Sequence, residues 1–243
     1  SPSYPALSFM SRKILPGQGG SPFNVPVTWY GRPLGSAFPS PISPKDIDQY
    51  HFNSSVIIEF RNQANLELSF TKSKHKNFHN RPDTINSRME KAIAGNGGVN
   101  GNETWNLFNP LLNSSSLIEY IKGSEQSLKI GELKSVDAII RTKLGENNLA
   151  IGLQLNQETL DVSYNELSRA EFNADGDLIK SADLLFLGGG RNTFAKRDKE
   201  AIFFEVEKIF SENVDMLFAS RFEKVDDESS LDPKVTLNYR PID

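Results

Sequence analysis

The chain has 243 residues, no cysteine, 24% charged residues and a formal net charge of −4. The lack of cysteine excludes disulfide scaffolds, thiolate metal sites and cysteine nucleophiles. The small net charge provides no general basic surface for a nucleic-acid backbone, so we expect no nucleic-acid partner. The longest apolar runs, residues 184–187 and 201–204, are far shorter than the roughly 20 residues that a membrane-spanning helix needs.

Residues 1–47 form a Pro/Gly-rich segment that contains nine of the thirteen prolines. Because proline fixes φ and removes a ladder donor, this segment predicts an extended loop with one short edge strand near residues 7–14. Phe23, Val25 and Trp29 are too apolar for low-complexity disorder. Residues 1–3 show no initiator Met and no signal peptide, so we expect the chain to begin at a cut.

Residues 48–243 alternate apolar and polar side chains with a period of two, which predicts β-hairpins. Val56, Ile58 and Phe60 alternate with polar neighbours before a turn near residues 62–65. The same pattern recurs around a turn near 144–147, where the apolar residues include Val136, Ile140, Ile151 and Leu153. It recurs again around 211–213, where they include Ile202, Phe204, Met216 and Phe218.

The connections between these strands differ in length. Three turns are short, whereas the connections near residues 73–125 and 165–197 are long. Short turns on one side of an up-and-down sheet and long loops on the other are typical of outer-membrane barrels. We therefore predict an all-β fold, an antiparallel transmembrane β-barrel segment of about eight strands. Its apolar side chains would face lipid, and its charged side chains would face the lumen.

Two short helices are expected within the first long loop. Asp83 is a candidate cap for a helix that passes through residues 89–93 and ends at Gly95. The serines at 114–116 are candidate caps for a helix over residues 117–121. Both segments are short, so we expect them to decorate the loop and not to form a domain.

Two motifs point to ligands, and each has a simpler interpretation. Asn173, Asp175 and Asp177 resemble the start of a calcium loop, but Leu178 and Leu184 occupy the positions of its glycine and its bidentate glutamate. A plain turn is the favoured interpretation. The triglycine at 188–190 resembles a phosphate loop without the following Lys-Ser/Thr pair and helix, which favours a flexible loop.

A basic segment contains His75 and His79 beside the lysines at 72, 74 and 76. On a helix this spacing would place both imidazoles on one face, but the context is strand-to-loop, which favours a solvated basic loop. The alternative is a contact with the phosphates of lipopolysaccharide. No local signature marks a catalytic nucleophile, and the sequence predicts no enzyme, no cofactor and no metal ion.

Several segments along about 210 residues resemble barrel and loop segments of TonB-dependent receptors. The segments are residues 31–35, 81–88, 108–110, 117–121, 183–189, 201–206, 220–223 and 231–235. In that family a barrel of about twenty-two strands encloses an N-terminal plug, and energy passed through TonB drives the uptake of siderophores, cobalamin or saccharides. The chain shows no plug, no TonB box and no aromatic-terminated last strand, so we expect a fragment of the barrel region.

The resemblance implies a location in the outer membrane of a Gram-negative cell. The implied partners are outer-membrane lipid and lipopolysaccharide, the plug domain and TonB system of the parent protein, and a small nutrient ligand. Ligand contacts vary within the family, so no binding residue is assigned. The alternative function is that of a soluble secreted β-rich protein for binding or adhesion.

Overall fold

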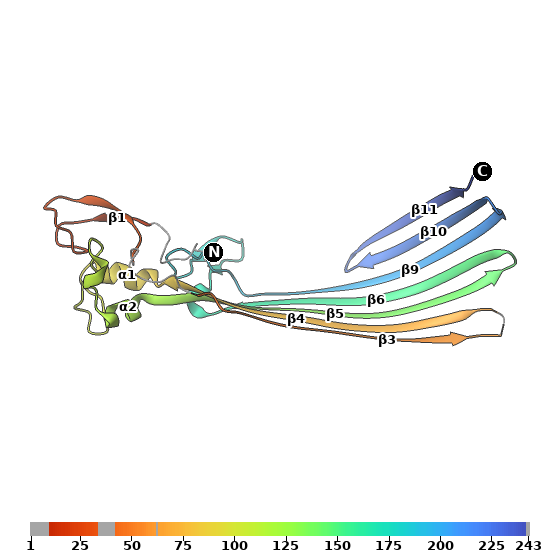
Figure 1. Cartoon of the computed structure of the whole chain (residues 1–243), viewed down its shortest axis with the longest axis horizontal. Coiled ribbons are helices and arrows are strands. Elements are labelled where there is room, and N and C mark those ends of the chain that lie inside the picture. Colours follow the sequence, from red (N-terminus) through yellow and green to blue (C-terminus); the bar gives the residue numbers. More distant parts are fainter. Residues whose placement is uncertain (1–9, 34–41, 62, 242–243) are drawn as a thin grey trace. The chain divides into compact units, whose positions relative to one another are not determined.

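The computed structural model describes residues 10–33, 42–61 and 63–241, and its chain folds mostly into β-strands (Figure 1). Strands account for 63% of the structure and form antiparallel sheets with few helices, which confirms the predicted all-β character. Two compact units are present. Unit 1 comprises residues up to 47 together with 77–129 and 162–193, and unit 2 comprises residues 48–76, 130–161 and 194–243.

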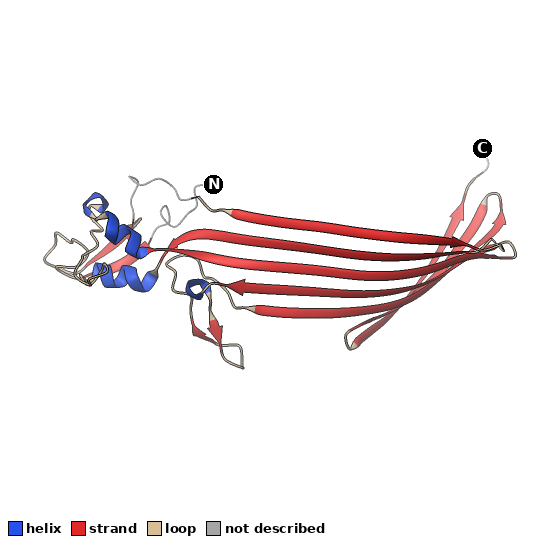
Figure 2. Cartoon of the chain, turned by 90° about the horizontal axis from the view of Figure 1, so that it is seen from below, coloured by secondary structure: helices blue, strands red, loops and turns tan. Residues whose placement is uncertain are grey.

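Unit 1 contains the apolar core. β1 (Met10–Ile14) pairs antiparallel with β2 (Val27–Gly31) in a separate two-stranded sheet and does not join the main sheet. The helices α1 (Asn86–Ile93) and α2 (Ser115–Ile121) contact each other and contribute to the same core (Figure 2). The buried members of this core are Met10, Ile14, Met89, Ala92, Ile93, Trp105, Leu107, Leu117 and Ile121. The predicted strand near residues 7–14 begins at Met10 in the described part, and residues 7–9 lie outside it.

The helix ends show one confirmed cap and one wrong prediction. The Ser114 hydroxyl accepts the Leu117 N–H, so the serine group caps α2. Asp83 does not cap α1. That role belongs to Asp183, whose carboxylate accepts both the N–H and the hydroxyl of Ser87 at 2.8 and 2.6 Å. At the other end Gly95 has φ +89°, as a left-handed cap requires.

Unit 1 also carries the smaller elements. A short hairpin joins β7 (Glu171–Phe172) to β8 (Leu178–Lys180). Single 3-10 turns occupy Pro110–Leu112 and Glu166–Ser168. In the described part of the chain, no helix has the length and apolarity needed to cross a bilayer.

The main sheet has seven strands in the order β11-β10-β9-β6-β5-β4-β3. Among the described residues this is close to the predicted number of about eight, and the order is open, because β3 and β11 end it without pairing to each other. The seven strands are β3 (Lys45–Glu59), β4 (Asn65–Thr84), β5 (Lys122–Leu144), β6 (Asn147–Tyr164), β9 (Thr193–Ser211), β10 (Val214–Val225) and β11 (Glu228–Tyr239).

The three predicted tight turns are present at residues 60–64, 145–146 and 212–213, and they lie at the same end of the sheet (Figure 1). The first long connection is shorter than predicted, because β4 continues to Thr84 and β5 begins at Lys122. The second is shortened by a few residues, because β9 begins at Thr193. The extension of β4 over residues 73–84 has Phe78 as its one large apolar residue, so apolar alternation does not reveal it.

β10 and β11 are joined by a further tight turn at 226–227, at the other end of those strands. The prediction that short turns lie at one end of the sheet and long connections at the other is therefore wrong for this hairpin, because the pairing of β10 with β11 closes directly at Val225 and Glu228.

Candidate functional site

The register of β9, β10 and β11 assigns each residue of unit 2 to one of two faces. Phe218 lies opposite Val206 on one side and Val235 on the other, and Phe222 likewise lies opposite Ile202 and Leu231. Directly opposed residues project from the same face of a sheet. We call this the apolar face, and Lys208, Ser220 and Pro233 also lie on it. Its apolar side chains in these strands are Ile202, Phe204, Val206, Val214, Met216, Phe218, Phe222, Leu231, Val235, Leu237 and Tyr239.

The apolar face of unit 2 is uncovered. Phe218 is 42% exposed, Phe204 is 39% exposed and Leu237 is 65% exposed. The rings of Phe204 and Phe218 lie 5.9 Å apart, so the aromatic side chains contact one another rather than a second layer. Large exposed apolar patches of this kind mark a surface that meets lipid or another molecule.

The opposite face, which we call the polar face, carries a hydrogen-bonded chain of side chains across several strands. The Arg221 guanidinium donates to the Gln154 Oε1 atom at 2.9 Å, and the Gln154 amide donates to Asp137 at 2.6 Å. The same Asp137 carboxylate accepts the Ser135 hydroxyl at 2.9 Å. This series of hydrogen bonds connects side chains of β10, β6 and β5. The Ser69 hydroxyl of β4 also donates to the Asp137 carboxylate, at a longer distance of 3.4 Å.

The polar face is held by further cross-strand pairs near the tight turns. Arg141 donates to Glu67 at 2.7 Å, and Asn148 donates to Glu207 at 2.8 Å. The buried Asp215 carboxylate accepts from Asn238 and from Arg240 at 2.7 and 2.6 Å. Sequence reasoning placed charged residues on this face but did not identify their partners, because the pairing depends on the register between strands.

One glycine allows an aromatic ring to lie within the polar face. A Cβ atom at Gly152 would lie 2.1 Å from the ring of Phe203, so only glycine leaves room for this ring on β6. The Arg221 guanidinium lies over the same ring, 6.0 Å from its centroid. The ring therefore supports the arginine that donates to Gln154.

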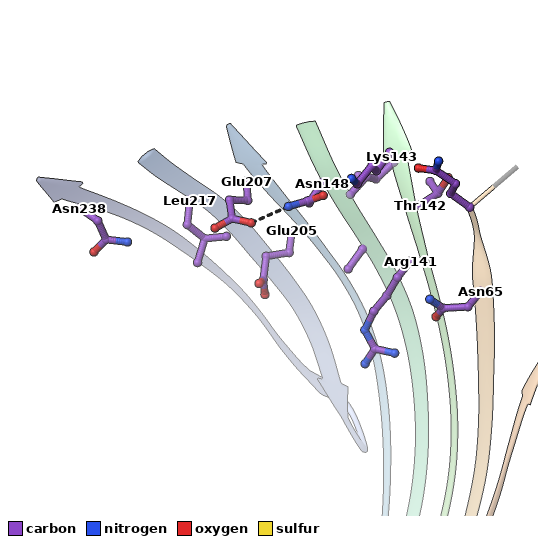
Figure 3. A pocket seen from close by; sticks show the side chains of 12 residues that line it. Asn65, Arg141, Thr142, Lys143, Asn148, Glu205, Glu207, Leu217 and Asn238 are labelled. Atoms are coloured by element: carbon purple, nitrogen blue, oxygen red, sulfur yellow. Dashed lines mark hydrogen bonds between the residues drawn. The ribbon is translucent and has the colours of Figure 1, made fainter. Parts of the chain in front are cut away.

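A hollow of about 490 Å³ opens on the polar face of unit 2. Figure 3 shows Arg141, Glu205, Leu217 and Asn238 among the side chains that line it, together with the hydrogen bond between Asn148 and Glu207. Cationic, acidic and amide groups are mixed here, so the hollow is polar without favouring one charge. Its composition suits a water-filled surface that contacts polar groups.

The candidate calcium motif forms the turn of the β7–β8 hairpin. The Asn173 side chain accepts the Asp177 N–H at 2.8 Å, and its amide donates to the Asp177 carboxylate at 3.1 Å. Gly176 has φ +88° within this turn. The motif is therefore a turn closed by Asn173 and Asp177, as the favoured interpretation predicted.

The triglycine lies in a loop, as the favoured interpretation predicted, and its last residue is hydrogen-bonded through the backbone. Gly190 bonds through its backbone to Ser168 and Ala170, at 2.9 Å in both cases. A Cβ atom at Gly189 would lie 2.0 Å from the Ser168 carbonyl oxygen, and one at Gly190 would lie 2.6 Å from the Tyr164 ring. These glycines permit close backbone packing and form no phosphate-binding turn.

His75 and His79 both lie on β4, which contradicts the predicted loop. Four residues along a strand span about 13 Å, so these two imidazoles do not share a ligand. His79 lies near the Ser43 hydroxyl, and its pKa is lowered by burial and by the charges of Arg81 and Lys45. Among the described residues, no cluster of three potential metal ligands is present.

Asp83, the misassigned cap, is a buried carboxylate of unit 1. It accepts three backbone N–H groups, from Thr84 at 2.6 Å, from Phe186 at 3.1 Å and from Leu187 at 2.7 Å. Burial raises its pKa, although these hydrogen bonds act in the opposite direction. The residue joins the end of β4 to segment 183–187 and has a structural role.

Comparison of the chain with family models, with curated proteins and with solved structures gives no match. The two faces of the unit 2 sheet are thus the features on which a functional argument rests.

Proposed function

We propose that the seven-stranded sheet forms part of the wall of an outer-membrane β-barrel, with its apolar face against lipid and its polar face toward the lumen. The observation that carries this proposal is the uncovered apolar face of unit 2. A soluble sheet would bury such a face under a second layer, whereas a bilayer supplies that layer itself.

The length of the apolar stretches supports a membrane role. In β10 the apolar-face residues run from Val214 to Phe222, and in β11 they run from Leu231 to Tyr239. Matching stretches occupy residues 52–60, 136–144 and 202–210 of β3, β5 and β9. Each covers nine positions, and a tilted strand needs about 9–11 residues to cross the hydrocarbon layer.

Aromatic residues mark the end of these stretches near the tight turns. Phe60 precedes the turn at 60–64 and Phe210 precedes the turn at 212–213. Tyr239 lies opposite Val214, and Val214 lies opposite Ser211 across the turn at 212–213. Tyr239 is therefore level with that turn. Aromatic girdles at the interfaces are typical of transmembrane barrels.

The hydrogen-bonded side chains of the polar face support an inward orientation. Arg221, Gln154 and Asp137 bond to one another in unit 2, and the nearby hollow is lined by mixed charges. The lumen of a large barrel is polar and filled by water or by a plug, so these groups would retain polar partners there.

We further propose that the barrel belongs to a TonB-dependent receptor for a scarce nutrient of the siderophore, cobalamin or saccharide class. The support for this part is the resemblance of segments 81–88, 183–189 and 231–235 to receptor barrels. The alternative is a soluble secreted β-rich binding protein, which the compact apolar core of unit 1 favours.

Membrane insertion is tested by adding the urea-unfolded chain to preformed phosphatidylcholine vesicles and separating the mixture on a density gradient. We expect the chain to float with the vesicles, to resist alkaline extraction and to migrate differently with and without boiling. A chain that stays in the soluble fraction as a folded species would contradict the proposal.

The receptor role is tested in the source cells by disrupting the gene that encodes this chain. We expect slow growth when one nutrient class is scarce, and normal growth when that nutrient is abundant. An uncoupler of the inner-membrane proton gradient should abolish the uptake of that nutrient in the undisrupted strain. Uptake that is unaffected by both treatments would contradict the receptor role while leaving membrane insertion intact.

A further inference from the structure

We propose that Lys72, Lys74 and Lys134 form a binding site for the phosphate groups of anionic lipids on the outside of the barrel. We call these three residues the lysine cluster. The inference rests on the proposed membrane function and adds a lipid partner to it.

The position of the lysine cluster is set by the period of two in β4 and β5. Leu68 and Phe70 share the parity of the apolar face in β4, and Lys72 and Lys74 continue that parity. In β5 the apolar stretch ends at Val136, and Lys134 is the next residue on the same face. The cluster thus follows directly on the apolar stretch, where the headgroups of a bilayer would begin.

Contacts between the strands confirm that these lysines are neighbours on one face. The Lys74 ammonium group lies 2.6 Å from the Glu132 carboxylate. On the opposite face the Ser69 hydroxyl contacts Asp137. Both pairs fit a single antiparallel register of β4 and β5, because Ser69 precedes Lys74 by as many residues as Asp137 follows Glu132. That register brings Lys72 of β4 opposite Lys134 of β5.

The charges of the cluster do not cancel. The Glu132 carboxylate bonds to Lys74, and this bond together with the charges of Lys74, Lys134 and Lys72 lowers the pKa of Glu132. One negative charge is therefore surrounded by three positive charges. Within the described residues, no carboxylate lies within ion-pair distance of Lys72 or Lys134. Two adjacent like charges that lack a protein partner are complementary to a phosphate.

The corresponding positions of β9 and β10 are balanced. Lys224 lies directly opposite Glu200, and Lys196 lies 2.8 Å from Asp198. Neither of these positions in β9 and β10 carries the unpaired positive charge that Lys72 and Lys134 carry in β4 and β5. Tyr50 of β3 shares the parity of the apolar face beside the cluster, and tyrosine is enriched at the level of lipid headgroups.

The proposal is tested with the whole chain reconstituted in phosphatidylcholine vesicles that contain a trace of spin-labelled lipid. The label is carried on the acyl chain of either phosphatidic acid or phosphatidylcholine, and the fraction of motionally restricted label is measured by electron paramagnetic resonance. Because each lysine near a membrane surface is worth about a fivefold gain in association, we expect phosphatidic acid to be preferred by about fivefold or more at low salt.

The test variant is Lys72→Gln with Lys134→Gln, and we expect its preference for phosphatidic acid to fall to near parity. The matched control is Lys143→Gln with Lys234→Gln, which removes the same charge from positions of the polar-face parity. We expect the control to keep the preference of the wild-type chain, and high salt to weaken that preference.

Two outcomes would overturn the lipid site. One is a restricted component without any preference for phosphatidic acid, and the other is an equal loss of preference in both double variants. The absence of any restricted component would instead show that the sheet does not meet lipid, which is a failure of the proposed membrane function.

Discussion

At the residue scale, consecutive residues of β9 lie alternately on the apolar face and on the polar face. Phe204 lies on the apolar face, whereas Glu205 lies opposite Ala219 on the polar face. Sequence alone gave these orientations, because the period of a strand is two. The sequence did not reveal that Arg221 reaches Gln154, because that contact spans β9 and depends on the register of three strands. It also gave no sign that Gly152 accommodates the Phe203 ring.

Because neighbouring residues of β9 lie on opposite faces, substitutions at Phe204 and Glu205 test which face meets lipid. We expect Phe204→Arg to destabilise the folded chain in vesicles by about 2–4 kcal/mol, because it places a charge toward lipid, and Glu205→Arg to cost less than about 1 kcal/mol. The measurement is the midpoint of urea unfolding in phosphatidylcholine vesicles. Equal losses at the two positions would contradict the assigned faces.

At the element scale, alternation and turn residues predicted the three hairpins with tight turns, but not how far the strands extend. β4 continues through Lys74 and His79 because main-chain bonding to its neighbours does not require apolar side chains. The cap of α1 was also beyond sequence reasoning. Asp183 reaches Ser87 from 96 positions away, whereas caps are recognised in a sequence by proximity.

The cap gives a prediction for unit 1. Asp183→Ala should lower its free energy of unfolding by about 1 kcal/mol, because Ser87 loses its acceptor. Both tryptophans, Trp29 and Trp105, lie in unit 1, so their fluorescence reports its unfolding. Asp175→Ala, in the exposed hairpin turn, is the control and should change the midpoint little. A variant of Asp183 that unfolds like this control would show that the cap contributes nothing.

Asp83 adds a dependence on pH within the same unit. Burial raises the pKa of this carboxyl above its usual range, so the folded chain holds the proton more readily than the unfolded chain does. Its contribution to stability is therefore present at low pH and is lost as the pH rises through the raised pKa. We expect Asp83→Asn to flatten this part of the pH profile, as measured by tryptophan fluorescence in urea. A profile of the same slope in the variant would contradict the assignment.

At the scale of the whole molecule, composition and connection lengths predicted the all-β class and the order of the hairpins, but not the exact number of strands in the described sheet. The number of strands depends on which pairs form, and alternation gives parity without pairing. In the part of the chain that the structure describes, the open order of the sheet leaves β3 and β11 with unpaired edge groups, and the apolar face of unit 2 is uncovered. In water both features favour association with other copies.

We therefore expect the whole chain in detergent-free buffer to form oligomers or aggregates rich in β-structure. Light scattering combined with size-exclusion chromatography measures this state. The proposed barrel wall would be contradicted by a compact monomer that unfolds cooperatively in plain buffer. Such a result would favour the soluble binding protein.

The central claim, that one face of the sheet meets lipid, is tested most directly by single cysteines along β9. The chain contains no cysteine, so each introduced thiol carries the only nitroxide label. Labels at 202, 204 and 206 in the vesicle-inserted chain should be more accessible to oxygen, which partitions into lipid, and labels at 203, 205 and 207 to a water-soluble nickel chelate. The account predicts this alternation with a period of two. Uniform accessibility to the nickel chelate at all six positions would contradict it.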